Sequence, residues 1–381
     1  MALKTARRGE IPPFFVMEVM RAACEREAAG GEVLHLEVGQ PSTAAPERVI
    51  AAATAALASD RLGYTEALGI PALRAAISRH YRERYGLEVP PCRIVVTTGS
   101  SGGFVLAFLA AFEAGDRVAM ASPGYPCYRN ILSALGVTPV EILVGPETRF
   151  QPTPELLEAV GPLDGLIVAS PANPTGTMIP APELKALADY CRRRGIRLIS
   201  DEIYHGITYG EPAASALGCG DEAVVLNSFS KYFSMTGWRL GWMVVPEALI
   251  RPVECLVQNL FISAPTVSQL AGVAAFDCRA ELDGHVARYA RNRALLLEEL
   301  PKVGLDRLAP AEGAFYLYAD VSALTDDSEG WCKRLLADTG VAITPGIDFD
   351  PARGRSFVRF SFAGATETIT EAARRLRAWV K

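Results

Sequence analysis

Short apolar runs alternate with helical patterns through the middle of the chain. Each run is rich in aliphatic or β-branched residues and ends in a polar or glycine-rich loop. The runs occupy residues 93–98, 117–122, 165–170, 196–200, 223–228 and 240–245. Nearly continuous apolar strands separated by helices are typical of a largely parallel sheet that is covered on both faces. The pattern therefore predicts an α/β fold.

The pattern changes near the two ends of the chain. Residues 16–31 have the character of a helix, and a short strand over 33–38 follows them. Toward the C-terminus, a long charged helix precedes strands and helices mixed in the manner of a smaller α+β domain. We expect a large domain over 45–280 and a small discontinuous domain formed by 1–44, with an N-terminal arm, and 281–381.

Composition narrows the class of protein. The 381 residues are 50% hydrophobic and 21% charged, with a net charge of −5, which is the balance of an ordinary globular enzyme and argues against a general nucleic-acid binder. The closest two of the eight cysteines are 23 residues apart, so we expect no metal site and only reduced thiols. The chain shows neither a signal-peptide pattern nor an apolar run long enough to cross a bilayer, and a cytoplasmic protein is expected.

Candidate chemistry lies in the loops after the apolar runs, because ligands bind beyond the carboxyl ends of parallel strands. In "TTGSSGG", Ser100, Ser101 and Gly102 precede an apolar helix and would offer backbone N–H groups to a phosphate. An ordinary helix cap is the alternative for this turn. Tyr125, in a Gly/Pro turn after the second run, suits either stacking on a planar ligand or packing within its loop.

The next two loops add an amide, a carboxylate and a phenol. Asn173 in "PANPTG" lies in a turn stiffened by prolines, which would fix one amide in place. Asp201 comes directly after the strand "IRLIS", where a carboxylate needs a partner such as a protonated ring nitrogen. Tyr204, three residues further on, could reach the same ligand.

The loop "NSFSKYF" places Ser228, Ser230 and Lys231 together, and Arg239 follows eight residues later. Two hydroxyls and a guanidinium suit a phosphate dianion. Lys231 is one of six lysines beside thirty-two arginines, and an amine, unlike a guanidinium, can lose its proton and attack a carbonyl. A solvated surface lysine is the alternative. With the other loops, these groups match the needs of pyridoxal 5′-phosphate: an amine for a Schiff base, a carboxylate for the pyridine nitrogen, and a phosphate cradle.

An ordered set of motifs resembles the class I/II aminotransferases of fold type I, the aspartate aminotransferase superfamily. The motifs are "GQP" (39–41), "GYTEALGIPALRAAI" (63–77), "TTGSSGG" (97–103), "SPGYP" (122–126), "PANPTG" (171–176), "SDEIY" (200–204), "SFSKYFSMTGWRLGW" (228–242), "GAFY" (313–316) and "FVRFSFA" (357–363). The resemblance covers nearly the whole chain. It implies a three-layer fold and an enzyme that moves an amino group from an L-amino acid to a 2-oxo acid by a ping-pong Schiff-base mechanism.

The resemblance also implies roles for the residues around the cofactor ring. Lys231 would form the Schiff base with pyridoxal phosphate and afterwards move the proton. Asp201 would pair with the pyridinium nitrogen, Tyr204 and Asn173 would hydrogen-bond the ring hydroxyl, and Tyr125 would stack on the ring. The phosphate would be held by Ser100, Ser101, Gly102, Ser228, Ser230 and Arg239.

Three more residues acquire roles from the resemblance. Arg359 matches the arginine that binds the substrate α-carboxylate, assisted by the Gly39 backbone and by Asn173. Because Arg359 lies in the small domain, substrate binding is expected to draw the two domains together. Tyr64 matches a tyrosine that reaches the phosphate of the neighbouring subunit, which implies a homodimer with shared active sites. Ser101 and Gly102 depart from the pattern, because many relatives carry a longer side chain there.

Alternative functions remain open at this point. A β-lyase or a cyclopropane-carboxylate-synthase-like enzyme of the same fold would share every motif that serves the cofactor. A dinucleotide-dependent dehydrogenase leaves Lys231, Arg239 and Arg359 without a role. A non-catalytic cofactor sensor needs a DNA-binding segment, and the first forty residues show no basic recognition helix.

The substrate side chain is the least defined part of the prediction. A dicarboxylic substrate usually needs a second cation, and Arg7 and Arg8 in the arm are not placed by the sequence. The adjacent segment carries apolar side chains, at Phe14, Phe15, Val16 and Met17. These residues either pack a helix onto the small domain or line the site, in which case an apolar or aromatic amino acid is expected.

Overall fold

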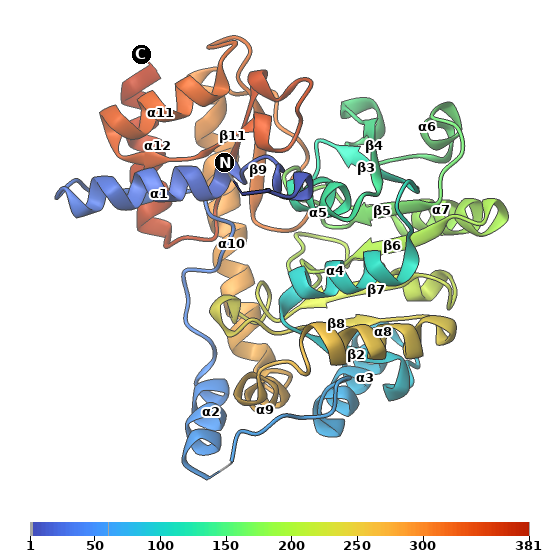
Figure 1. Ribbon diagram of the computed structural model, residues 1–381. Coiled ribbons are helices and arrows are strands. Elements are labelled where there is room, and N and C mark those ends of the chain that lie inside the picture. The colour runs from blue at the N-terminus through green and yellow to red at the C-terminus, as the bar shows by residue number, and fades with distance from the viewer. Residues whose placement is uncertain (1–2, 60, 381) are drawn as a thin grey trace.

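The computed structural model describes residues 3–59 and 61–380, and it has a central sheet between two layers of helices (Figure 1). Within these residues, seven strands form that sheet in the order β2-β8-β7-β6-β5-β3-β4. Strand β8 is antiparallel to both of its neighbours, and the other pairs are parallel. The strands are β2 (Ile94–Thr97), β3 (Arg117–Ser122), β4 (Thr138–Leu143), β5 (Gly165–Ala169), β6 (Arg197–Asp201), β7 (Val224–Ser228) and β8 (Gly241–Val244). The predicted α/β fold with a mostly parallel sheet is confirmed.

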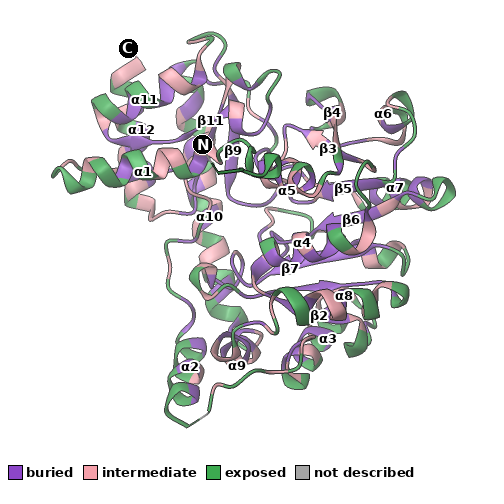
Figure 2. Ribbon diagram, in the orientation of Figure 1, coloured by how far each residue is buried: buried purple, intermediate pink, exposed green. Residues whose placement is uncertain are grey.

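The two faces of the sheet enter separate hydrophobic cores, because successive side chains of a strand point to opposite faces. Val95 and Ile167 pack with helices α4 (Gly99–Ala111), α5 (Pro126–Leu135) and α8 (Glu247–Leu260). Val96 and Leu166 pack on the other face. The helices there are α3 (Pro71–Tyr85), α6 (Pro154–Ala159), α7 (Ala181–Arg194) and α9 (Thr266–Ala275), and α9 also packs against α2 (Glu47–Ser59). Figure 2 shows the buried strands between helices whose outer sides are exposed.

The two ends of the chain pack together beside this sheet. Strand β1 (Leu34–His35) pairs parallel with β10 (Val341–Ala342). A smaller antiparallel sheet has the order β11-β12-β9, formed by β11 (Thr344–Pro345), β12 (Phe357–Ser361) and β9 (Tyr316–Asp320). In Figure 1 helix α1 lies beside the C-terminal helices. The helices of this region are α1 (Phe15–Ala28), α10 (Arg279–Glu299), α11 (Ser328–Thr339) and α12 (Thr366–Val380).

This packing is compatible with the expected discontinuous small domain, and the division at 44/45 and 280/281 stays a prediction. Helix α10 begins at Arg279, so the second boundary falls within its first turn. Each of the eight cysteines, all in the described part of the chain, is free. Among the described residues, no helix combines the length and apolar character needed to cross a membrane.

Two elements differ from the sequence pattern. Strand β4 was not predicted, because most of its residues are exposed or only partly buried at the edge of the sheet and include Pro139. Helix α4 begins at Gly99, five residues before its apolar stretch, so the glycine- and serine-rich turn forms the first turn of the helix. The serines thereby come to the helix N-terminus.

Candidate active site

A cavity lies where the carboxyl ends of the parallel strands meet the smaller sheet. It brings together most of the residues that the sequence singled out: Gly39, Ser100, Ser101, Tyr125, Asn173, Asp201, Tyr204, Ser230, Lys231, Arg239 and Arg359. Their positions follow from the topology. Asp201 ends β6, Lys231 follows β7, and Arg239 precedes β8. Because β8 runs antiparallel to β7, its beginning lies at the same edge of the sheet as the ends of the parallel strands.

Lys231 lies on the side of this cavity that Gly39 and Tyr204 form. Its Nζ donates a hydrogen bond to the Gly39 carbonyl oxygen at 2.5 Å and lies 5.8 Å from the centre of the Tyr204 ring. Burial lowers the pKa of Lys231 to about 8, and the positive charges of Arg359 and Arg239 act in the same direction. A much larger fraction of the amine is therefore neutral near pH 7 than for an exposed lysine, which is the state that attacks a carbonyl.

The Asp201 carboxylate is buried and accepts two hydrogen bonds from other residues of the protein. Its Oδ1 accepts a hydrogen bond from the Ile203 backbone N–H at 3.0 Å, and its Oδ2 accepts one from the Tyr128 hydroxyl. Burial raises the pKa of Asp201 to about 6, while these two hydrogen bonds act against the rise. A cationic N–H in the cavity would stabilise the ionised carboxylate further, so the site suits a protonated pyridine nitrogen. Tyr128, which comes from α5, is not among the predicted site residues.

The turn that follows Asp201 is anchored by a second carboxylate, that of Glu202. Glu202 Oε1 accepts hydrogen bonds from the Ala216 N–H at 2.8 Å, from Ser215 Oγ at 3.1 Å and from Ser200 Oγ at 3.2 Å. Burial raises the pKa of Glu202 to about 7. This side chain therefore connects the end of β6 to the loop around residue 215.

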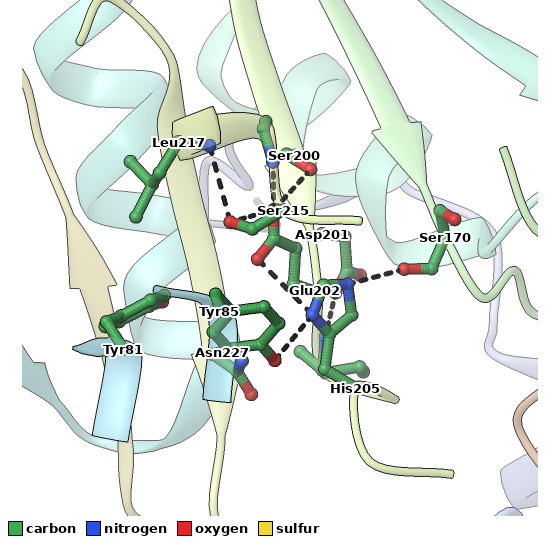
Figure 3. A network of polar contacts seen from close by, with 12 residues as sticks. Tyr81, Tyr85, Ser170, Ser200, Asp201, Glu202, His205, Ser215, Leu217 and Asn227 are labelled. Atoms are coloured by element: carbon green, nitrogen blue, oxygen red, sulfur yellow. Dashed lines mark hydrogen bonds and ion pairs between the residues drawn. The ribbon is translucent and has the colours of Figure 1, made fainter. Parts of the chain in front are cut away.

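His205 completes the anchoring of the same turn, between Tyr85 and Ser170 (Figure 3). Burial lowers the pKa of His205 to about 3, so the imidazole is neutral. Its Nε2 lies 3.0 Å from the Ser170 carbonyl oxygen and its Nδ1 lies 2.9 Å from the Tyr85 hydroxyl. A neutral ring satisfies both partners when Nε2–H donates and Nδ1 accepts. These contacts hold the backbone that carries Asp201.

The proposed phosphate cradle forms around the N-terminus of α4. Ser100 and Ser101 lie in its first turn, where among the described residues no side chain caps the helix, so backbone N–H groups remain for an anion. Arg239 comes close to this turn, because a Cβ atom on Gly99 would lie 2.5 Å from Arg239 Nη2. Gly99 also has a φ of +72°, which favours glycine. The helix end and the guanidinium together fit a phosphate dianion.

Three residues of the predicted set lie outside the cavity lining. Ser228 lies behind Ser230: its Oγ donates to Ser230 Oγ at 2.9 Å and accepts from the Ser230 N–H at 3.0 Å. Gly102 is buried against Thr98, whose Oγ1 a Cβ at residue 102 would overlap. Tyr64 is 83% exposed, and its predicted role requires a second subunit. Direct phosphate contacts by these three residues stay predictions.

Arg359 is the most buried cation of the site, at 1% exposure. Its Nη1 donates to Asn173 Oδ1 at 2.8 Å, and its Nη2 donates to the Glu37 carbonyl oxygen. The guanidinium carbon lies 4.3 Å from the centre of the Tyr316 ring and 4.7 Å from that of the Phe349 ring. Arg359 Nε has no hydrogen-bond partner among the described residues. A buried guanidinium held between two rings, with a free donor, fits a carboxylate ligand.

Tyr316 connects these groups and was not singled out from the sequence, although it ends the motif "GAFY". Its hydroxyl lies 2.6 Å from that of Tyr204, and its ring covers Arg359. A Cβ atom on Gly39 would overlap the Tyr316 hydroxyl, so a side chain at residue 39 is sterically excluded. The glycine of "GQP" is thereby explained by this close approach.

The remaining wall of the cavity is largely apolar. Phe14 and Val16 from the N-terminal arm line it with Ile203, and Phe14 packs edge-on against Tyr125, with ring centres 5.9 Å apart. Met17, by contrast, is 46% exposed. The prediction left open whether the arm lines the site or packs a helix, and the structure shows that it does both.

Within the described part of the chain, no cationic side chain lines the cavity apart from the three that were predicted from the sequence. Its lining includes Lys231, Arg239 and Arg359, and each of these is already expected to bind cofactor or α-carboxylate. Arg7 and Arg8 lie in a short exposed 3-10 helix, η1 (Arg7–Gly9). Residues 3–59 and 61–380 of a single subunit therefore offer no further cation in this cavity for a side-chain carboxylate.

Comparison with known proteins identifies the class. Residues 31–376 match the family model described as aminotransferase class I and II, and the chain belongs to this family. It is a pyridoxal-phosphate-dependent aminotransferase, which moves an amino group from an L-amino acid to a 2-oxo acid. The predictions of family, fold, enzyme class and cofactor are thus confirmed.

Individual relatives are similar over their full length. The valine–pyruvate aminotransferase of Mycobacterium tuberculosis is 59% identical, with an alignment that covers 100% of this chain and 99% of the relative. The crystal structure of an aminotransferase from M. tuberculosis, also 59% identical, has a TM-score of 0.98 and the same coverage. The aspartate aminotransferase of Thermus thermophilus with maleate is 33% identical, with a TM-score of 0.94 and full coverage of both chains.

Proposed function

We propose that this enzyme takes its amino group from an apolar, branched L-amino acid such as valine and transfers it to a short 2-oxo acid such as pyruvate. The observation that carries the proposal is the apolar wall of the cavity, which is formed by Phe14, Val16 and Ile203. Within the described chain, no additional cation lines the cavity to bind a side-chain carboxylate. The 59% identity to a valine–pyruvate aminotransferase supports the same donor and acceptor.

The residues present fit pyridoxal phosphate, with a buried acid, a neutralisable amine and an anion cradle around one cavity. When bound, the cofactor supplies an aldehyde that joins to amines and a ring that takes up the electron pair left at the substrate Cα. We assign the ring nitrogen to Asp201, the ring hydroxyl to Tyr204 and Asn173, and stacking to Tyr125. The phosphate is assigned to the first turn of α4, to Ser230 and to Arg239.

The chain's own groups then position the substrate and move the proton. Arg359 binds the α-carboxylate, so that the Cα–H bond is held on the side of the cavity where Lys231 lies. Lys231 accepts and returns the proton, which requires the neutral amine that its lowered pKa makes available. Glu37, through its carbonyl oxygen, and Asn173 keep the Arg359 guanidinium in place before substrate arrives.

We also propose a homodimer in which Tyr64 completes the neighbouring site. The supporting observation is a group of exposed apolar side chains in and after α2 and at the end of α8: Ile50, Leu57, Tyr64, Leu260 and Ile262. The segments after α2 and after α8 adjoin, since Thr266 Oγ1 donates to the Gly63 carbonyl oxygen at 2.6 Å, and exposed apolar side chains on adjoining segments are typical of an interface. We further propose a cytoplasmic location and the closing of the small domain on substrate through Arg359.

The substrate proposal is tested by measuring kcat/KM for L-valine, L-alanine, L-phenylalanine and L-aspartate, each with 2-oxobutyrate as the acceptor, so that every donor gives a product distinct from the reactants. We expect valine to be preferred over aspartate by at least tenfold, because the aspartate side-chain carboxylate would be buried against the apolar wall without a partner cation, whereas the valine methyl groups fit there. Strict preference for aspartate would refute the proposal, and so would a product balance in which ammonia replaces the amino acid product.

A further inference from the structure

Helix α1 begins beside the cavity without a capping side chain of its own. Its N-cap residue is Phe14, whose side chain offers no hydrogen-bond acceptor. The Asp348 carboxylate takes that place from the other end of the chain: Oδ1 accepts from the Phe15 N–H and Oδ2 from the Val16 N–H, each at 3.2 Å. A carboxylate at a helix N-terminus satisfies free N–H groups and complements the helix dipole.

The two capped amides belong to the segment that forms the apolar wall. Phe14 and Val16 line the cavity on either side of Phe15, so the position of their side chains depends on where this first turn is held. Asp348 is itself 2% exposed, and it ends the short helix η7 (Gly346–Asp348). The side chain of its neighbour, Phe349, packs on the Arg359 guanidinium. One short segment thus supports both the Arg359 guanidinium and the helix start whose residues line the apolar wall.

We propose that Asp348 is a positioning residue that fixes the N-terminal arm over the cavity and thereby sets the preference for larger apolar side chains. The inference rests on the proposed function, because it concerns the donor of the same reaction. Without the two acceptors, the Phe15 and Val16 amides lose their partners, and no carboxylate holds the first turn of α1 in place. Phe14 and Val16 then no longer form a fixed wall, and a substrate side chain that needs that wall loses its contacts.

The test compares Asp348→Ala, which removes both acceptors, with Asp348→Asn, which keeps one. Valine and alanine are the two donors, because alanine carries a single methyl group and makes little use of the wall. We expect Asp348→Ala to lower the valine-to-alanine ratio of kcat/KM by roughly tenfold, mainly through the KM for valine. We expect a smaller fall for Asp348→Asn.

Two controls separate this role from general destabilisation. Thr153→Ala removes another helix cap, the hydrogen bond from the Leu156 N–H to Thr153 Oγ1 at the start of α6, and should leave the ratio unchanged. In a Phe14→Ala background, Asp348→Ala should add little to the loss already present, because both changes act through the same wall. If Asp348→Ala lowers the valine-to-alanine ratio by the same factor in the Phe14→Ala background as in the unmodified enzyme, the proposal is overturned.

A second readout does not depend on activity. Hydrogen–deuterium exchange of the Phe15 and Val16 amides in the holoenzyme should become faster in Asp348→Ala and remain slow in Thr153→Ala. Unchanged exchange overturns the proposal, as does faster exchange with an unchanged valine-to-alanine ratio. If the unmodified enzyme does not use valine, the proposed function fails on its own, while the exchange measurement still decides whether Asp348 holds the arm.

Discussion

The pH dependence of covalent cofactor capture by Lys231 follows directly from the environment of this amine. In the protein without cofactor, burial lowers the pKa of Lys231 from 10.5 to about 8, and Arg359 and Arg239 contribute to the shift. At pH 7 an amine of pKa 8 is neutral in about one molecule of eleven, and one of pKa 10.5 in about one of three thousand. Capture at pH 7 should therefore be roughly 300-fold faster than for an ordinary lysine in the same position.

The assay mixes cofactor-free protein with pyridoxal phosphate and follows the absorbance of the lysine-bound cofactor between pH 6 and 10.5. The rate should rise about tenfold per pH unit at low pH and level off above about 8, since the neutral amine is the reactive form. Nα-acetyl-lysine, with its rate first corrected for the neutral fraction of its ε-amine, gives the pH dependence that comes from the ionisation of the cofactor, and dividing by it removes that contribution. Lys231→Ala gives the background from other lysines.

A matched pair of variants tests the physical cause. Arg359→Gln removes a positive charge that lowers the Lys231 pKa, so the point at which the rate levels off should move to higher pH. Arg355→Gln, at an exposed arginine of the same segment, should leave it in place. A rate that continues to rise until pH 10.5 in the unmodified protein would refute the reasoning.

Three substitutions test other contacts of the site. Arg359→Lys should lower kcat/KM about 10- to 150-fold, because it removes one charge-assisted hydrogen bond of about 1.5–3 kcal/mol; an unchanged value would show that the α-carboxylate binds elsewhere. Tyr128→Phe removes a hydrogen bond that keeps the pKa of Asp201 down, so cofactor affinity measured by equilibrium dialysis should weaken by roughly tenfold; equal affinity contradicts the assignment of Asp201. Gly39→Ala should abolish activity because its Cβ atom overlaps Tyr316, whereas Gly9→Ala, with open space around it, should be fully active.

Much of the fold and the site follows from patterns that are local in sequence. The strands with continuous apolar runs were predicted because both of their faces are buried, and the residues after them converge because parallel strands end at one edge. Asp201, Lys231 and Arg239 were found for this reason. Strand β4 was missed because an edge strand needs no continuous apolar run.

The functional side chains that could not be predicted from the sequence act through contacts between segments that are distant along the chain. Tyr128 reaches Asp201 from a helix 73 positions away, and Tyr316 reaches Tyr204 across 112 positions. Asp348 caps a helix that begins 333 positions earlier. Tyrosine is common in protein cores and aspartate is common in turns. The local sequence around Tyr128, Tyr316 and Asp348 therefore does not distinguish them from residues with a purely structural role.

The central claim is that this cavity binds pyridoxal phosphate through Lys231 and transfers an amino group in two separate half-reactions. The most direct measurement adds L-valine, without any oxo acid, to the purified holoenzyme and records the absorbance spectrum. The account predicts that the absorbance of the lysine-bound cofactor is replaced once, in proportion to active sites, by that of the amino form. Added pyruvate should then restore the first spectrum and release one equivalent of alanine. Continued release of oxo acid and ammonia over many turnovers, or a Lys231→Ala protein with the same spectrum as the unmodified enzyme, would contradict it.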